Sequence, residues 1–326
     1  MKVPNFSCSI LIILSLCFSY ANLTAQHKVG ILVLAHGGNK NWNHTVNEAV
    51  EHLKKNYEVE IAFGMADPKS MQKGINKLEE KGITKIVVLQ LFISSFSPII
   101  RQNEYLLGLR KELADEPMIM NHTSMNHSHI DSQQNNYNNS LKNHTHHISN
   151  DNMNHNGEEL KLKPLSIKAK IYLTDPLNDH PVVAEILTDR IRELSNSPEN
   201  ETIILVAHGP NDEEDNKKWL STLESIAEQI RKESNNFKNI FCLTVRDDAP
   251  KEIYEIAKEN LRSLVRQASK NSSVIIIPVL LSQGGIEKGI VERLDGLTYK
   301  WNGKTLLPNK KIIRFLDDSI KKALQE

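Results

Sequence analysis

The sequence predicts an α/β protein with two similar lobes, each a parallel β-sheet flanked by helices. Two observations carry this prediction. Runs of Val, Ile and Leu without polar alternation, at 29–34 and 203–206, are typical of strands buried on both faces, which belong to parallel sheets covered by helices. Each run leads into Ala-His-Gly, and the elements that follow recur in the same order about 172 residues later.

The expected elements alternate between strand and helix, which is the order of βαβ units. In the first half we expect strands at 29–35, 59–63 and 86–93, with helices at 46–53 and 71–81. In the second half we expect strands at 203–207, 240–245 and 274–281, with helices at 220–230 and 253–268. Each second strand leads to a proline with an acidic residue shortly before it, at Asp67-Pro68 and at Asp248 ahead of Pro250.

The two Ala-His-Gly histidines, His36 and His208, are expected at the carboxyl ends of strands. Ligands of open α/β sheets bind in the crevice outside those ends. Gly37 and Gly209 let the backbone turn tightly beside each imidazole. We therefore treat His36 and His208 as candidate site residues, His36 first because internal duplication often leaves one copy idle.

The first 26 residues indicate an export signal. Lys2 supplies a positive start, residues 10–18 an apolar core, and the segment around Ala25 a small-residue end. Cleavage is expected next to Ala25 or Gln26, and we expect no membrane-spanning segment in the chain after cleavage. The expected location is periplasmic or secreted. The alternative is that the signal is not cleaved and anchors the protein in the membrane. Cys242 then remains as a small core residue, so no disulfide framework is expected.

A biased segment at 118–160 separates the expected lobes at 27–117 and 161–326. It is rich in Asn, Ser, His and Met and has no apolar periodicity, so we expect a disordered insertion. Imidazole binds Co, Ni, Cu and Zn, which makes the segment a candidate metal-collecting tract; the alternative is a solvated spacer. Its candidate ligands are His127, His129, His144, His146 and His147.

The composition and motifs of the chain give no support for a nucleic-acid partner or a nucleotide cofactor. The chain has 40 Lys and Arg against 40 Asp and Glu, and no long basic run, so no nucleic-acid partner is expected. It has no glycine-rich phosphate loop, so no nucleotide cofactor is expected. We expect a monomer with two lobes.

Together these motifs resemble a known family. The Ala-His-Gly after the first strand, the acidic residue and proline before the second helix, the Val-Val-rich third strand and residues 174–181 are similar to those of class II chelatases. The closest resemblance is to the sirohydrochlorin cobaltochelatases and ferrochelatases of CbiX and SirB type, and it covers 28–110 and 165–326. It implies two flavodoxin-like, chelatase-like lobes and a lyase that inserts Co or Fe, without ATP, into an anionic tetrapyrrole of cobalamin or sirohaem synthesis.

The resemblance also implies roles for residues. His36 matches the family's first histidine and would hold the metal or accept pyrrole protons, and His208 is its equivalent in the second lobe. Lys40 and Arg101 are candidates for contacting the macrocycle carboxylates.

The sequence departs from the family at the second histidine expected after the third strand, where this chain has Phe96 or a neighbour. Glu104, as a catalytic base, and Glu287, as a metal ligand, are the candidate replacements; alternatively both are solvated residues that open helices. The missing histidine and the signal leave a second hypothesis, an exported non-catalytic protein that binds metal or tetrapyrrole on a chelatase scaffold. A third is a purely structural duplicated protein.

Overall fold

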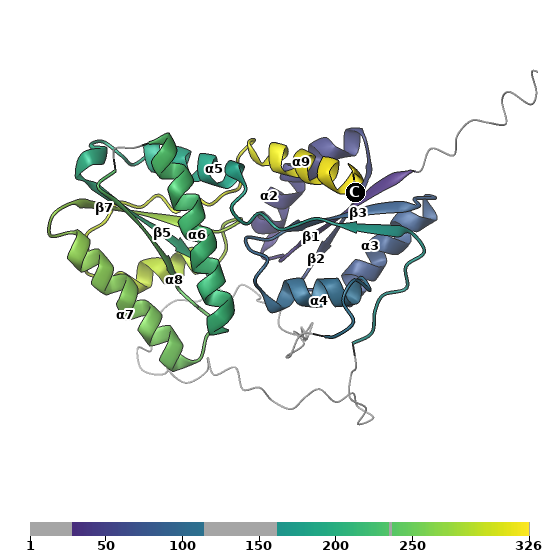
Figure 1. The fold of residues 1–326 in the computed structure, drawn as a ribbon, viewed down its shortest axis with the longest axis horizontal. Coiled ribbons are helices and arrows are strands. Elements are labelled where there is room, and N and C mark those ends of the chain that lie inside the picture. Colours follow the sequence, from purple (N-terminus) through teal and green to yellow (C-terminus); the bar gives the residue numbers. More distant parts are fainter. Residues whose placement is uncertain (1–27, 114–161, 235–236, 326) are drawn as a thin grey trace, which may run out of the picture.

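The computed structural model describes residues 28–113, 162–234 and 237–325, which form two α/β lobes side by side (Figure 1). The expected signal and most of the expected insertion, including its histidines, lie outside these residues. The first part of the chain forms β1 (Val29–Ala35), α2 (Lys40–Val50), η1 (Glu51–Lys55), β2 (Glu58–Phe63), α3 (Pro68–Glu80), β3 (Lys85–Leu91), α4 (Pro98–Leu106) and β4 (Lys170–Leu173).

The remaining elements belong to the C-terminal half of the chain. They are α5 (Pro181–Arg192), η3 (Pro198–Asn200), β5 (Glu201–Ala207), α6 (Glu213–Glu233), β6 (Asn239–Thr244), α7 (Lys251–Ala268), β7 (Ser273–Val279), α8 (Ile286–Arg293) and α9 (Ile312–Gln325). All six expected strands are present, and the predicted α/β class with parallel sheets is confirmed.

Both sheets are parallel and have an Ala-His-Gly strand inside them. The first has the order β2-β1-β3-β4 and the second β6-β5-β7. The interior of β1 and the whole of β5 are buried, which explains their continuous apolar sequence. In the second lobe an isolated parallel bridge between Ile275 and Lys300 takes the place that β4 has in the first.

Helices α3 and α4 each begin with a capping side chain that is followed by a proline. The Asp67 side chain accepts hydrogen bonds from the backbone amides of Lys69 and Ser70, and Pro68 opens α3. Ser97 caps α4 in the same way ahead of Pro98. Proline fits the first helical turn because its missing N–H is not needed there. These caps fix where the chain turns back after the carboxyl ends of β2 and β3.

The two halves of the chain exchange elements, which corrects the expected boundary at 161. Residues 165–173 pack on the first lobe, where β4 pairs with β3. Helix α5 then crosses to pack on α6 and β7 of the second lobe, and α9 returns to pack on α2, β3 and β4 of the first (Figure 1). The pairing of β4 with β3 places residues 165–173 on the first lobe, and helix packing places α5 and α9. Hydrophobic periodicity along the sequence does not specify these partners.

The exchange produces a shared core. One hydrophobic cluster contains Val33 from β1, Leu205 from β5, Val183 from α5 and Phe315 from α9, whereas two smaller clusters cover the far face of each sheet. The lobes are thus joined through buried apolar contacts. Within residues 28–113, 162–234 and 237–325 there is no helix that is long and apolar enough to cross a membrane.

Cys242 is half-buried in β6 and packs against this shared core, as expected. Burial raises the pKa of its thiol, and the nearby Glu224 carboxylate adds to the effect. Because the thiolate is the reactive form, the raised pKa leaves little of this cysteine in that form at neutral pH.

Candidate functional site

A cleft of about 1160 Å³ lies between the lobes, at the carboxyl ends of the central strands. His36 and His208 both line it, as do the segments that follow β3 and β7. The structure therefore brings the two sequence-predicted histidines to one cavity. Apolar side chains form much of the remaining wall: Trp42, Met65, Phe92, Ile93, Ile99, Trp219, Leu280, Leu281 and Ile286.

The His36 imidazole has a defined tautomer. Its Nδ1 lies 2.7 Å from the Gly37 carbonyl oxygen, which only accepts hydrogen bonds, so Nδ1 carries a proton, and the neutral form of the ring has its lone pair on Nε2. Gly37 has φ +79°, and an added Cβ would lie 3.1 Å from Cβ of Phe63. Glycine is therefore required for the turn that presents this ring.

Trp42 supports His36 from the first turn of α2. The two ring centroids are 6.4 Å apart, and Trp42 also meets Phe63 edge-on. The buried indole lies close to Gly284 of the second lobe, since a Cβ added to that glycine would be 3.7 Å from Trp42 Cδ1. The His36 wall and the loop after β7 consequently meet at this end of the cleft.

His208 has a different environment. Its Nε2 lies 3.6 Å from Oδ1 of Asp248, which also lines the cleft. Arg246 braces the His208 loop by donating from Nε to the Pro210 carbonyl at 3.0 Å and pairing with Glu213 at 2.7 Å. The second lobe thus holds its histidine beside a carboxylate.

Charge is divided unequally between the walls. Among the described residues, the cations lining the cleft are Arg101 and Arg110 of the first lobe. That side also contributes one carboxylate, Glu112, whereas the second lobe contributes four carboxylates and no cation: Asp212, Asp215, Asp248 and Glu287. One contact joins the two sets, because Arg101 Nη2 lies 2.8 Å from Oδ2 of the buried Asp215. Arg101 was expected to meet substrate carboxylates; it lines the cleft, but its guanidinium is paired across the lobes.

The segment after β3 is held by the second lobe. Trp219 of α6 donates from Nε1 to the Phe96 carbonyl at 2.6 Å, and Asn178 accepts from the Ser95 amide at 2.8 Å. The Phe96 ring does not line the cleft and lies under the Lys218 ammonium, 5.5 Å from it. The position expected to supply the family's second histidine therefore presents a carbonyl to its neighbour.

Two of the other candidates, Glu104 and Lys40, are not among the residues that line the cleft. Glu104 faces Arg110 at 3.5 Å, because the turn after α4 brings that cation back toward the helix. Lys40 is exposed at the start of α2, where the neighbouring Asn39 lines the cleft and caps the helix.

Glu287 does line the cleft. Its carboxylate accepts hydrogen bonds from the Gly284 amide, at 3.2 and 3.0 Å to its two oxygens, so it shapes the loop at the start of α8. In the part of the chain that the structure describes, no three or more His, Cys, Asp or Glu side chains gather closely enough to hold a metal.

His180 caps one helix and packs against another. Its Nδ1 accepts from the Val182 amide at 3.3 Å to begin α5, and its ring meets Phe315 of α9 edge-on at 5.3 Å. Burial lowers the pKa of this imidazole, against the opposing effect of Asp318.

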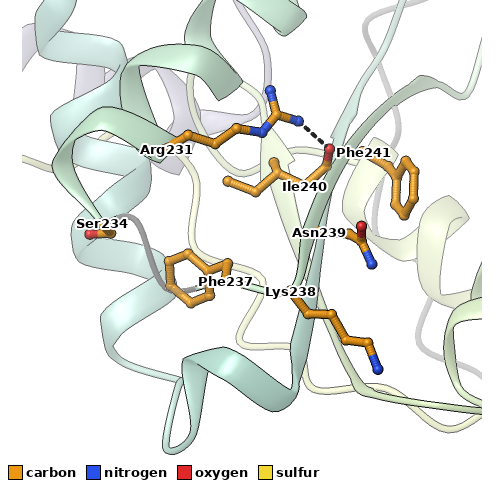
Figure 2. Close-up of a pocket in the computed structure, with 7 residues that line it drawn as sticks. All are labelled: Arg231, Ser234, Phe237, Lys238, Asn239, Ile240 and Phe241. Carbon is orange, nitrogen blue, oxygen red and sulfur yellow. Dashed lines mark hydrogen bonds between the residues drawn. The ribbon is translucent and has the colours of Figure 1, made fainter.

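A second hollow, of about 370 Å³, lies at the amino end of β6 (Figure 2). Arg231 crosses it to donate to the Ile240 carbonyl at 2.6 Å. The described residues that line it include no imidazole or carboxylate: Arg231, Ser234, Phe237, Lys238, Asn239, Ile240 and Phe241. It lies at the end of the sheet opposite the histidines and lacks their chemistry.

Known proteins share this architecture. A family model named CbiX matches residues 30–96, from β1 to the segment after β3, including His36. SirB from Bacillus subtilis with Fe3+ has a TM-score of 0.56 and 14% identity over 91% of this chain and 95% of that chain. The sirohydrochlorin chelatase SirB from Bacillus subtilis subspecies spizizenii, in complex with cobalt, has a TM-score of 0.52 and 14% identity over 91% and 96%.

A third structure is CbiX, described as the terminal enzyme for siroheme biosynthesis in denitrifying bacteria. It has a TM-score of 0.51 and 12% identity, and covers 91% of this chain and 99% of that chain. No curated protein sequence matches the chain significantly.

The two lobes, the cleft at the strand ends and these similarities define a chelatase fold. The resemblance to class II chelatases of the CbiX and SirB type is confirmed, by fold over both lobes and by the family model over the first.

Proposed function

We propose that the protein inserts a divalent metal, Co or Fe, into a sirohydrochlorin-type tetrapyrrole in the cleft between the lobes, without ATP. The observation that carries the proposal is His36: it lies within the CbiX match and lines the cleft, and its hydrogen bond through Nδ1 leaves Nε2 as the nitrogen with the lone pair in the neutral ring. The structures similar to this chain include a sirohydrochlorin chelatase in complex with cobalt.

The reaction exchanges protons for metal. One divalent ion enters the macrocycle as two pyrrole N–H protons leave, so the charge carried in equals the charge carried out. A neutral imidazole is suited to accept such a proton near neutral pH. His36 Nε2 takes one of the two protons, because its Nδ1 already donates to the Gly37 carbonyl, and solvent water takes the other.

The walls of the cleft match an anionic macrocycle. Trp42, Ile93 and Leu281 supply apolar surface for the ring faces, and Arg110 supplies a cation for peripheral carboxylates. Arg101, already paired with Asp215, holds the two walls together.

Metal insertion into sirohydrochlorin, followed by absorbance with Co2+, Fe2+ and Ni2+ in turn, tests the proposal. We expect rapid insertion by the protein and a loss of at least about 100-fold in kcat in His36→Ala, the scale of losing one general base. His44→Ala is the matched control, since His44 is exposed on α2 and pairs with its neighbour Glu48 at 3.3 Å. A His36→Ala variant as active as His44→Ala would overturn the assignment.

The segment that follows β3, residues 92–98, contains no histidine, which favours a second candidate, a protein that binds metal or tetrapyrrole without turnover. It predicts that deletion of 118–157 removes most of the bound metal while His36→Ala changes little. The enzyme predicts the reverse: His36→Ala abolishes insertion, and the deletion only weakens metal supply.

We also propose that the protein is exported, because its amino-terminal residues have the pattern of an export signal. N-terminal sequencing of the protein recovered from the periplasm or the medium should find a chain beginning near Gln26. A full-length chain confined to the cytoplasm would contradict export.

A further inference from the structure

The cleft wall of the first lobe contains a hydrogen-bond donor that has no partner among the described residues. Trp42 is 8% exposed and lines the cleft. Its ring contacts His36 and Phe63 and its backbone amide donates to Asn39, but its indole N–H, at Nε1, donates to no described atom. A buried indole usually finds an acceptor, because an unpaired buried donor costs free energy.

This N–H is open to the cleft. In the part of the chain that the structure describes, the fully buried side-chain polar atoms without a partner are Asn103 Oδ1 and Arg293 Nε, so Trp42 Nε1 keeps contact with open space. The neighbouring ring atom, Cδ1, would lie 3.7 Å from a Cβ added to Gly284, and a Cβ added to Gly285 would meet nothing within 4 Å. The two glycines therefore leave space beside the donor edge of the indole.

The indole is also held in one orientation. A Cβ added to Gly38 would come within 2.9 Å of Trp42 Cγ, so the glycine backbone lies against the ring. The Gly38 amide donates to Asn43 and the Trp42 amide to Asn39, each at 2.9 Å, which fixes the first turn of α2. Phe63 meets the ring edge-on with centroids 6.4 Å apart. The donor is thus preorganised, and a ligand does not have to order it.

The donor determines the chemistry of its ligand. An indole N–H only donates, so the group it binds is a hydrogen-bond acceptor. The first turn of α2 contains no acidic residue, so the partial positive charge at this helix end favours an anion. The opposing charge is Glu287, whose two oxygens accept from the Gly284 amide. A carboxylate is the acceptor that gains most from the donor and the helix end together.

We propose that Trp42 Nε1 donates a hydrogen bond to a peripheral carboxylate of the tetrapyrrole and so orients the macrocycle beside His36. The identity of the ligand rests on the proposed function, whereas the unpartnered donor does not. The ring centroids of Trp42 and His36 are 6.4 Å apart, so a carboxylate held at Nε1 places the adjoining pyrrole near the imidazole. Trp42 thereby selects macrocycles that carry an acceptor at this edge.

The indole 15N–1H resonances of the full chain, which has three tryptophans, test the donor directly. The Trp42 resonance is the one lost in Trp42→Phe. With metal-free sirohydrochlorin, we expect exchange of this proton with water to slow at least about tenfold, because a hydrogen-bonded proton is protected. Trp301 does not line the cleft, and its exchange should stay within about twofold. Unchanged exchange at Trp42 when sirohydrochlorin is bound overturns the proposal.

Affinity measures the strength of the bond. Trp42→Phe keeps an aromatic ring and removes the donor, so the Kd for sirohydrochlorin, from an absorbance titration, should rise about tenfold, the scale of one hydrogen bond to a charged group. Trp301→Phe is the matched control, since Trp301 packs against the far face of the second sheet, and should stay within about twofold.

An isostere separates the donor from the packing of the ring. Replacing Trp42 by 3-benzothienylalanine keeps the indole shape and puts sulfur in place of the N–H. We expect the same rise in Kd as in Trp42→Phe. An affinity equal to that of the unmodified protein would show that the N–H does not bind the ligand.

Turnover separates this inference from the proposed function. In a working chelatase, Trp42→Phe should raise the KM for sirohydrochlorin about tenfold and leave the KM for Co2+ unchanged. Slowed exchange at Trp42 in a protein without turnover supports the inference and overturns the enzyme. Turnover with an unchanged KM for sirohydrochlorin in Trp42→Phe overturns the role of Trp42 alone, and a protein that does not bind sirohydrochlorin overturns both.

Discussion

The two lobes place a histidine at the same point of the same topology, but they brace the surrounding loops with different chemistry. In the first lobe the bracing groups are neutral amides: buried Gln102 donates to the Ala66 carbonyl at 3.1 Å, and buried Gln90 donates to the Thr174 carbonyl at 2.9 Å. In the second lobe they are the buried guanidinium groups of Arg246 and Arg293.

The two sheets also differ at the position beside their third strand, β3 in the first lobe and β7 in the second. The first lobe fills it with β4 and a regular ladder, whereas the second has one bridge at Lys300, whose ammonium pairs with buried Glu201 at 2.6 Å. The difference teaches that a duplicated scaffold conserves strand order more strictly than the means of stabilising it. Because its bracing depends on charges, we expect the second lobe to be more sensitive than the first to substitution of the bracing residues.

The largest expected effect is at Arg293. This side chain is 1% exposed, pairs with Asp247 at 2.7 Å, donates to the Val245 carbonyl and lies 3.9 Å from the Tyr254 ring centroid. Arg293→Met leaves Asp247 and the carbonyl unpaired, so we expect a loss of about 3–5 kcal/mol in the free energy of unfolding, measured in urea. Lys288→Met, at an exposed position of the same helix, is the control, and equal losses would contradict the comparison.

The next effect is at the pair that joins the walls. Asp215→Asn should lower the free energy of unfolding by about 1–3 kcal/mol, because Arg101 is partly exposed and regains some water. A double-mutant cycle with Arg101→Met measures the coupling. Zero coupling energy would show that the pair does not hold the lobes.

A smaller effect is expected in the first lobe. Gln102→Leu removes the donor to the Ala66 carbonyl in a buried site and should cost about 1–2 kcal/mol. Because the group removed is neutral, this loss should stay constant between pH 5 and pH 8. A loss as large as that of Arg293→Met would erase the proposed difference between the lobes.

The smallest effect is a pH dependence at Glu201. Burial opposes ionisation of this carboxyl, but hydrogen bonds from Lys300, Ser195 and the Asn196 amide outweigh it and lower its pKa below the ordinary 4.5. Because this pKa is lower in the folded state than in the unfolded state, the ionised carboxyl stabilises the folded protein above pH 4.5. This stabilisation is lost as the pH falls through the folded-state pKa. Glu201→Gln should therefore flatten the acid limb of a plot of unfolding free energy against pH; an unchanged limb would contradict this.

Much of the fold and the centre of the site follow from local sequence. Continuous apolar runs specified β1 and β5. The Ala-His-Gly at the end of each run placed His36 and His208 at the carboxyl ends of these strands, where both line the cleft. Asp67 before Pro68 marked the start of α3, because a cap and a proline act within one turn. The resemblance to chelatases rested on these same short motifs.

Tertiary structure decided what depends on residues distant in the chain. The pairing of β3 with β4, the crossing of α5 and α9, and the commitment of Arg101 to Asp215 all join segments that periodicity treats as independent. The same is true of Glu104, drawn to Arg110, and of the 3.6 Å between His208 and Asp248. Sequence patterns report which face of an element is buried; only packing determines which partner buries it, and therefore which side chains meet in the cleft.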